Sequence, residues 1–284
     1  MPVESLETIE SRLLLEAIYK CYGYDFRSYT LDGIQSRLQS IVKRENLQSI
    51  SCMIPLLLHD QSFFNKLLKN LLVTVTDFFR APLSYKALKQ TVMPVLSTYP
   101  YINVWCAGCA TGEEAYSIAI LLKEAGLLKR SQIYATDIND KSLAVGKSGI
   151  YSLNKLDISS QNYFQAGGET DFSKYYTTKY NAFMMNKDLR ERILFSKHNL
   201  VSDGVFAEMH LVLCRNVCIY FNDKLQTDVF HLLHRSLIRN GYLFMGMNER
   251  MDYEPFNSLF KLISESDCVY KKQESDIVKM YSNQ

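Results

Sequence analysis

The chain has 284 residues, with 32 Lys and Arg against 30 Asp and Glu. This length is close to the upper limit of a single hydrophobic core, so we expect one large domain and a smaller one. The nearly balanced charge argues against a dedicated nucleic-acid-binding protein, which normally carries a basic excess. The chain has no apolar run of about 18 residues and no signal-peptide pattern, which favours a cytoplasmic protein without direct membrane insertion.

Apolar residues at helical spacing dominate residues 1–72, where we expect a small all-helical domain. Residues 5–21 and 31–42 each carry an apolar stripe, and Asp60 is placed to cap a further helix that runs through Leu71. The stripe of the first helix comprises Leu6, Ile9, Leu13, Ala17 and Ile18. The polar side of the second helix presents Arg37, Lys43 and Arg44, which taken alone are typical of a solvated helix face.

Residues 73–98 form a linker and a helix between this bundle and an α/β pattern. The helix is expected to start at Pro82, a favourable first helical residue, and to run toward Leu96. A short apolar strand then spans residues 101–105.

A glycine turn follows this strand and leads into a helix. Gly108 and Gly112 lie in the turn, and the apolar residues after it recur at helical spacing. This strand, turn and helix are typical of sites where a helix N-terminus faces a nucleotide-like ligand. Cys106 and Cys109 form a C-x-x-C pair, but no second pair follows at zinc spacing. We interpret the pair as small residues lining the turn and expect no metal site, with zinc or redox chemistry as the alternative.

A second strand, residues 133–137, ends in Asp137. A carboxylate at this position can accept hydrogen bonds from both hydroxyls of a ribose. The turn lacks the full G-x-G-x-x-G spacing of dinucleotide sites, so the pattern favours an adenosine without a pyrophosphate. The sequence therefore predicts S-adenosylmethionine as the cofactor, although a glycine turn plus an acid, taken alone, is common to many α/β proteins.

The remaining residues of the α/β domain, 99–284, carry an interruption followed by further strands. Residues 175–183 are rich in strand formers and residues 193–195 follow, so we expect a small antiparallel insertion over about 167–197. The expected elements after it are a strand at 209–213, a helix at 223–239 closed by Gly241, and strands at 242–247 and 268–270.

Four further segments accompany the turn Gly108-Cys-Ala-Thr-Gly-Glu-Glu114 in a fixed order. They are Thr74-x-Thr-x-Phe-Phe-Arg80, His198-Asn-Leu200, Cys214-Arg-Asn-Val-Cys-Ile-Tyr-Phe221 and Gly246-Met-Asn-Glu249. With these motifs the chain resembles the CheR family, the S-adenosylmethionine-dependent methyltransferases of bacterial chemotaxis, over nearly its whole length. That family methylates glutamate side chains of chemoreceptors.

The resemblance implies a class I methyltransferase fold. This is an α/β, Rossmann-like sheet of seven strands, with a preceding all-helical domain and an inserted antiparallel β-subdomain. It also implies a set of cofactor-binding residues: Thr74, Thr76, Arg80, Gly108, Glu113, Asp137, Asn199, Leu200, Asn216 and Val217. Thr76 and Arg80 would reach the methionine end, Glu113 would lie near its amino-acid portion, and Asp137 would hold the ribose. The adenine would be bordered by Asn199 and Leu200, with Asn216 and Val217 as the floor.

Three positions depart from the family pattern. Thr74 replaces the usual Asn, Ala115 replaces a Pro, and Met247-Asn248 replaces a His-Ser pair near the expected substrate entrance. Tyr220 is expected near the sulfonium, with an equal claim to a structural role, and Phe78 and Phe79 are expected to pack in the core.

The implied activity is transfer of a methyl group to receptor glutamates, with S-adenosylhomocysteine as the product. A glutamate side chain has an ordinary pKa of about 4.3, so it is already ionised and needs no general base. We therefore expect no catalytic acid or base in this chain. The partner would be a glutamate-rich cytoplasmic receptor helix, which Arg37, Lys43 and Arg44 could steer. The alternatives are an S-adenosylmethionine-binding signalling module and a methyltransferase for another protein, an RNA or a small molecule.

Overall fold

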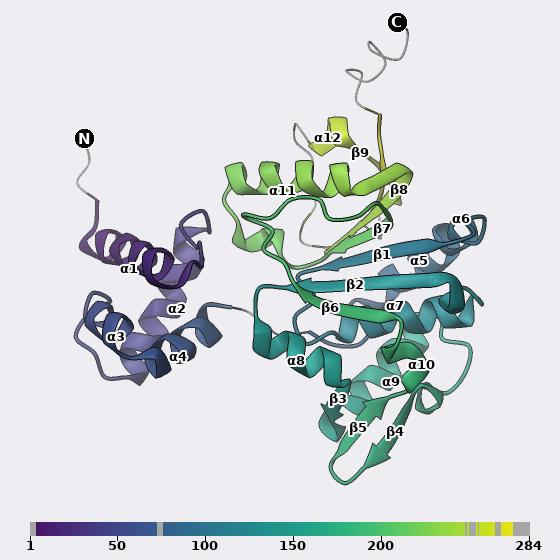
Figure 1. Ribbon diagram of the computed structural model, residues 1–284, viewed down its shortest axis with the longest axis horizontal. Coiled ribbons are helices and arrows are strands. Elements are labelled where there is room, and N and C mark those ends of the chain that lie inside the picture. Colours follow the sequence, from purple (N-terminus) through teal and green to yellow (C-terminus); the bar gives the residue numbers. More distant parts are fainter. Residues whose placement is uncertain are drawn as a thin grey trace, which may run out of the picture. The chain divides into compact units, whose positions relative to one another are not determined.

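The computed structural model describes residues 4–72, 76–247, 249, 254, 256–264 and 268–274 (Figure 1). The chain divides into two compact units by its internal contacts. The helical unit comprises the residues up to Val73 together with Tyr220–Gln226, and the α/β unit comprises Thr74–Ile219 and the residues from Thr227 onward. Within the described ranges, no helix combines the length and the apolar character needed to cross a bilayer.

The helical unit is built on four helices over residues 4–72. These are α1 (Leu6–Tyr22), α2 (Leu31–Arg44), α3 (Met53–His59) and α4 (Gln61–Leu71). The carboxylate of Asp60 accepts a hydrogen bond of 2.7 Å from the backbone N–H of Ser62, so Asp60 caps α4 as predicted.

The buried side of α1 differs from the one expected. Leu6 and Leu13 are 72% and 55% exposed and Ile9 is also exposed, whereas Leu14 and Ile18 are fully buried. Helices α2 and α3 pack against α1 on the Leu14 side. Because α1 carries apolar residues on more than one side, helical spacing alone could not tell which side its neighbours would cover.

A seven-stranded sheet forms the centre of the α/β unit, in the order β6-β2-β1-β7-β8-β10-β9. The first five strands run parallel to their neighbours, and β10 pairs antiparallel with both β8 and β9. The strands are β1 (Ile102–Ala107), β2 (Ser131–Asp137), β6 (Ile193–Lys197), β7 (Met209–Cys214), β8 (Leu237–Met245), β9 (Phe260–Ser264) and β10 (Val269–Lys272). This order is that of the class I methyltransferase fold, as predicted.

Helices flank the sheet in the α/β unit (Figure 1). They are α5 (Pro82–Thr91), α6 (Met93–Leu96), α7 (Glu113–Glu124), α8 (Asp140–Ser148), α9 (Leu156–Gln165), α10 (Lys187–Arg190), α12 (Phe256–Leu259) and the part of α11 (Asp223–Ser236) from Thr227 onward. Short 3-10 helices lie at η1 (Leu128–Arg130), η2 (Leu153–Lys155), η3 (Phe172–Tyr175) and η4 (Cys218–Tyr220). Both α7 and α8 pack against β2 and β6.

A small antiparallel sheet lies apart from the large one, in the order β3-β5-β4 (Figure 1). Its strands are β3 (Ile150–Ser152), β4 (Tyr176–Lys179) and β5 (Ala182–Met185). Two differences from the expected insertion follow. The sheet recruits β3 from before residue 167, and the segment 193–197 is not part of it but pairs parallel with β2.

The position of β6 is fixed by the side chain of Phe195. A Cβ atom on Gly112 would lie 2.8 Å from the Phe195 ring, and one on Gly146 would lie 2.4 Å from it. The ring therefore fills space that two glycines leave open, between the start of α7 and α8. Such contacts join residues far apart in sequence, so the local strand pattern at 193–195 could not assign this strand to a sheet.

The end of α11 was also predicted wrongly. The helix ends at Ser236 and not near Arg239, and Gly241 lies within β8 and does not close the helix. The register between β7 and β8 shifts between Met209 and Leu211. Asn240 has φ +63° in this irregular stretch, and asparagine tolerates that left-handed conformation better than most residues.

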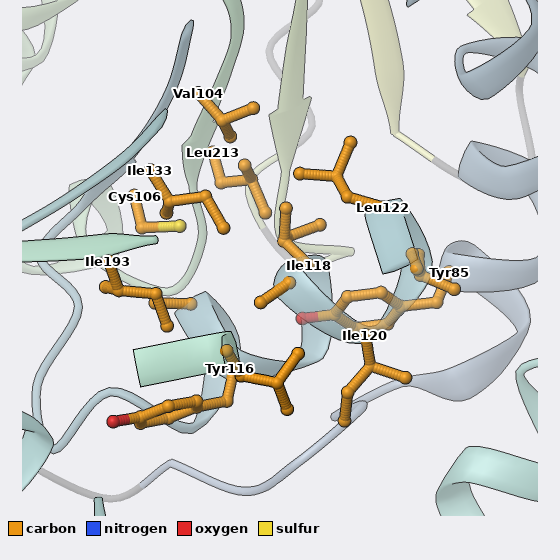
Figure 2. Close-up of a cluster of buried hydrophobic side chains, with 14 of the residues drawn as sticks. Tyr85, Val104, Cys106, Tyr116, Ile118, Ile120, Leu122, Ile133, Ile193 and Leu213 are labelled. Carbon is orange, nitrogen blue, oxygen red and sulfur yellow. The ribbon is translucent and has the colours of Figure 1, made fainter. Parts of the chain in front are cut away.

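The core of the α/β unit lies between the sheet and α7 (Figure 2). Val104 and Cys106 of β1 and Ile133 of β2 meet Ile118 and Leu122 of α7, and all are fully buried. Phe78 and Phe79 are fully buried as well, which confirms the prediction that they pack in the core.

Candidate active site

The carboxyl ends of β1, β2 and β7 share one edge of the sheet. Ala107 of β1 lies beside Thr136 of β2, and Cys106 lies beside Leu213 of β7, all in parallel register. From β1 the chain proceeds to β2 and β6 on one side and later returns to β7 on the other. Ligands of open α/β sheets bind outside the strand ends at such a switch in strand order.

The glycine turn after β1 needs glycine at both ends. Gly108 has φ +72°, and a Cβ atom there would lie 2.5 Å from Cγ2 of Val217. Gly112 has φ +91° and is the N-cap residue of α7. The turn after β1 and the loop after β7 therefore approach each other as closely as backbone and side chain allow.

Asp137 ends β2 and points toward this turn. Its Oδ2 accepts a hydrogen bond of 2.9 Å from the backbone N–H of Ala110, and its Oδ1 accepts one of 2.9 Å from that of Asn139. Burial raises the pKa of the Asp137 carboxyl, and the two N–H donors oppose this rise. The residue is partly exposed. Because a carboxylate has about four acceptor positions, both oxygens retain capacity for a ligand's hydroxyl groups.

Glu113 begins α7 and is 1% exposed. Its Oε2 accepts a hydrogen bond of 2.6 Å from the Thr111 hydroxyl, and its Oε1 lies 2.5 Å from Nζ of Lys155. The same ammonium donates to the carbonyl of Thr76 at 2.9 Å. Lys155 thereby joins Thr76 and Glu113, two residues that the sequence placed near the methionine end. Sequence analysis missed Lys155, because its 3-10 helix lies some 40 residues beyond Glu113 and carries no motif.

The segment around Arg80 is held by a second basic residue, Arg215, which lies in a motif of the sequence but was assigned no role there. Nη2 of Arg215 donates to the carbonyl of Arg80 at 2.9 Å, and its Nη1 lies 3.2 Å from Oε1 of Glu114. Arg215 is 7% exposed, with its guanidinium 4.5 Å from the centroid of the Phe244 ring. Burial raises the pKa of the Glu114 carboxyl, and the charge of Arg215 opposes this. The side chain of Arg80 itself is exposed.

Asn199 and Leu200 follow β6 at the same sheet edge. The backbone N–H of His198 donates to the carbonyl of Asp137 at 3.2 Å. Asn199 and Leu200, which follow His198, therefore start directly beside the end of β2. Asn199 and Leu200 are both partly exposed. Oδ1 of Asn199 accepts a hydrogen bond of 3.0 Å from the N–H of Val201, so this side chain also shapes its own turn.

Asn216 and Val217 follow β7, opposite the glycine turn. Asn216 has φ +59°, and both residues are partly exposed. The carboxylate of Glu249 accepts hydrogen bonds from their backbone N–H groups at 2.6 and 2.8 Å. Glu249 is 1% exposed, whereas Met247 is 56% exposed. Both ends of the late Gly-to-Glu motif, Gly246 and Glu249, are therefore buried, whereas Met247 between them faces solvent.

The remaining predicted residues belong to the helical unit or fall outside the described residues. Tyr220 belongs to the helical unit, where the guanidinium of Arg37 lies 4.7 Å from its ring centroid. Arg37 also donates to the carbonyl of Leu71 at 2.6 Å, so it is not a simple solvated cation. Lys43 and Arg44 are exposed. Thr74 and Asn248 lie outside the described residues.

The strand order, the glycine turn and the acid that ends β2 together define a class I methyltransferase. Residues 74–268 match the family described as CheR methyltransferase, SAM binding domain, and residues 9–72 match CheR methyltransferase, all-alpha domain. The chain belongs to the CheR methyltransferase family, and its cofactor is S-adenosylmethionine. The close approach of Gly108 to Val217 and the spare acceptor positions of Asp137 fit such a cofactor.

Several relatives are similar over most of the chain. The putative methyltransferase Cher3 of Pseudomonas putida is 43% identical over 272 residues, covering 96% of this chain and 100% of the relative. Chemotaxis protein methyltransferase 1 of Pseudomonas aeruginosa is 26% identical, with 78% of this chain and 83% of the relative covered. An uncharacterized 104.1 kDa protein of Rhodobacter capsulatus is 30% identical over 88% of this chain, but the chain spans only 26% of that protein.

Proposed function

We propose that this protein is a protein-glutamate O-methyltransferase that converts glutamate side chains of a chemoreceptor to methyl esters. Family membership supports the methyltransferase activity, and relatives named chemotaxis protein methyltransferase support the chemotactic role. The observation that carries the proposal is the partly exposed Asp137 beside the Gly108 turn, with acceptor positions unused at the switch in strand order.

In this proposal the cofactor lies along the shared edge of β1, β2 and β7. The ionised carboxylate of Asp137 accepts from the ribose hydroxyls, and Asn199 and Leu200 border the adenine. Gly108 lets the turn approach the cofactor, and Asn216 and Val217 form the floor. The methionine end extends toward Thr76, Arg80 and Glu113, with Thr74 as a further contact.

The proposed chemistry requires little of the chain beyond alignment. The cofactor supplies a methyl group activated by the positive charge of its sulfur. The acceptor carboxylate is ionised at neutral pH, with an ordinary pKa of about 4.3, so we assign no general base. The chain's residues fix the cofactor at several points, which aligns the methyl group with an incoming oxygen and lowers the entropy cost of the reaction. Lys155 balances the buried charge of Glu113 and ties it to Thr76.

The proposed partner is a cytoplasmic receptor helix rich in glutamates. Lys43 and Arg44 are exposed on α2 and would attract such a helix through long-range electrostatics. Arg37, the third basic residue of that face, is partly engaged by Leu71 and Tyr220 within the helical unit. Arg44 pairs with Glu45 at 3.1 Å and donates to Asn70 at 2.8 Å. We therefore assign most of the steering to Lys43 and smaller parts to Arg44 and Arg37.

The decisive experiment is transfer of a tritiated methyl group to purified cytoplasmic fragments of chemoreceptors. We expect incorporation that alkali releases as methanol, since methyl esters are base-labile. The incorporation should disappear when the accepting glutamates are changed to alanine. Tight binding of S-adenosylhomocysteine without incorporation into any fragment would favour a signalling module, which the changes at Thr74 and Met247 also suggest. Base-stable incorporation would indicate that the methyl group is transferred to an acceptor other than a carboxylate.

A further inference from the structure

The carboxylate of Glu249 is enclosed by backbone N–H groups. Within the described part of the chain, five such groups donate to it: Gly246 at 2.9 Å, Asn216 at 2.6 Å, Val217 at 2.8 Å, Cys218 at 2.9 Å and Ile219 at 3.4 Å. Four of the five are consecutive residues of the loop after β7. Glu249 is 1% exposed, so these bonds replace nearly all of its contact with water.

Consecutive N–H groups that converge on one point form a concave site for an anion. Asn216 adopts φ +59°, and η4 starts two residues later at Cys218, so the loop turns its N–H groups to one side. Within the described residues, the N–H groups of Asn216 and Val217 donate to Glu249 and not to a strand or helix carbonyl. Since a buried N–H without a partner costs about 1–3 kcal/mol, this conformation depends on the carboxylate.

The same loop forms one wall of the proposed cofactor site. The Val217 side chain faces Gly108 so closely that a Cβ atom on the glycine would lie 2.5 Å from it. On the other side, a Cβ atom on Gly246 would lie 2.6 Å from Oε2 of Glu249 and 3.1 Å from the nitrogen of Asn216. The loop is therefore held between the Gly108 turn and the Glu249 carboxylate, and small shifts of the carboxylate would be passed to Asn216 and Val217.

We propose that Glu249 is a positioning residue for the methyl transfer. It fixes the backbone of Asn216 and Val217 in the conformation that forms the cofactor floor, without touching the cofactor or the substrate. Because its acceptor positions are filled by the loop, it takes no part in recognising the receptor. This inference rests on the proposed function only in assigning Asn216 and Val217 to the cofactor floor.

The test compares Glu249→Ala and Glu249→Gln with the wild type and with Glu254→Ala, an exposed acid of the same segment. We expect the KM for S-adenosylmethionine and the Kd for S-adenosylhomocysteine to rise at least about tenfold in Glu249→Ala. The kcat at saturating cofactor should change by less than about threefold, since bound cofactor restores the loop. Glu249→Gln should lie between, because an amide keeps one acceptor oxygen but brings a donor toward the N–H groups.

Chemical rescue separates positioning from general stability. Millimolar formate should lower the raised Kd of Glu249→Ala by refilling the concave site, and chloride at equal ionic strength should not. A folded Glu249→Ala variant with an unchanged Kd, or equal recovery with both salts, would overturn the proposal.

If the alanine variant does not fold, hydrogen–deuterium exchange of Glu249→Gln decides the question. Faster exchange confined to residues 215–219 supports the proposal, and unchanged exchange there contradicts it. Failure of the proposed function would look different, because the wild type would not bind S-adenosylhomocysteine or would transfer no methyl group to receptor fragments. The exchange difference at 215–219 would persist in that case.

Discussion

Two carboxylates hold the loops at the carboxyl edge of the sheet, and they do so in different ways. Asp137 accepts one backbone hydrogen bond on each oxygen and stays partly exposed. Glu249 is 1% exposed and, among the described residues, receives five backbone donors. A carboxylate with unused acceptor positions can shape a turn and still bind a ligand, whereas a saturated one can only shape its surroundings.

The largest expected effect is the loss of cofactor binding on removal of Asp137, the carboxylate with unused acceptor positions. Changing Asp137→Ala should weaken binding of S-adenosylhomocysteine by at least about 100-fold, because two hydrogen bonds to a charged acceptor are lost at about 1.5–3 kcal/mol each. Isothermal titration calorimetry measures this loss.

Asp140→Ala is the matched control for that experiment. Asp140 lies three residues further along, with its side chain 66% exposed and 3.0 Å from Nζ of Lys197. Exposed ion pairs contribute about 0–1 kcal/mol, so cofactor affinity should stay within about twofold of the wild type. Equal cofactor affinities for Asp137→Ala and the wild type would contradict the proposal that Asp137 binds the ribose.

The glycine turn offers the next largest effect, on stability. Gly108→Ala should destabilise the fold more than Gly126→Ala, although both glycines have nearly the same φ, +72° and +71°. A Cβ atom on Gly126 meets nothing within 4 Å, whereas one on Gly108 meets Val217 at 2.5 Å. Gly126→Ala should cost about 1 kcal/mol for the left-handed backbone, and Gly108→Ala about 1–3 kcal/mol more for the clash.

Urea unfolding measures both free energies. Adding Val217→Ala to the Gly108→Ala variant should recover the part due to the clash but not the part due to φ. An equal loss of unfolding free energy in the two glycine variants would mean that the loop after β7 can move away from Gly108. Such movement would argue against a rigid loop at the proposed cofactor site.

Titration of Asp137 should have a smaller effect, and it should change protein stability and cofactor affinity in opposite directions. Burial raises the pKa of Asp137, so its proton is bound more tightly in the folded state than in the unfolded one. Stability from this group is therefore present at acid pH and is lost as pH rises through the folded pKa. Cofactor affinity should change in the opposite direction, because only the ionised carboxylate accepts from both hydroxyls.

The predicted pH dependence of cofactor affinity can be tested by calorimetry, from neutral pH down through the raised pKa of Asp137. The wild type should lose affinity for S-adenosylhomocysteine, by about tenfold for each pH unit below the pKa. Asp137→Asn, which does not titrate, should show a flat profile at a lower affinity. A wild-type profile parallel to that of Asp137→Asn would assign the titration to another group.

The smallest expected effect lies outside the carboxyl edge, on α2. Reversing Lys43→Glu and Arg44→Glu together should slow receptor methylation at low salt by less than about tenfold, and salt should abolish the difference. Cofactor affinity should stay unchanged, unlike in variants of Asp137 and Glu249. Reversal of two exposed lysines of the α/β unit, Lys179→Glu with Lys187→Glu, changes the net charge equally and is the control. If the control lost as much methylation rate, the effect would be due to net charge and not to the position of the basic residues.

The sequence predicted the parts of the fold that local patterns encode. Helical spacing located α2 and α4, and the strand before Gly108 and the acid at Asp137 predicted the sheet edge where both are found. The order of the motifs identified the family. These features are readable because each depends on residues that are neighbours in the chain.

The features that sequence analysis missed depend on contacts between distant residues. Lys155 meets Glu113 across 42 positions, Arg215 meets Glu114 across 101, and Glu249 meets Asn216 across 33. For the same reason, the wrong side of α1 was predicted to be buried, and β6 was predicted to belong to the small antiparallel sheet. Apolar spacing gives the period of an element, but the neighbouring elements decide which of its sides is covered.

The ring of Phe195 has a consequence for how this protein can vary. It occupies the space that the absent side chains of Gly112 and Gly146 leave open. A larger residue at Gly146 would be tolerated only after a smaller one had appeared at 195, whereas the φ of +91° requires glycine at 112 whatever residue stands at 195. The order of substitutions along any lineage is thereby restricted at a place that never touches the methyl group.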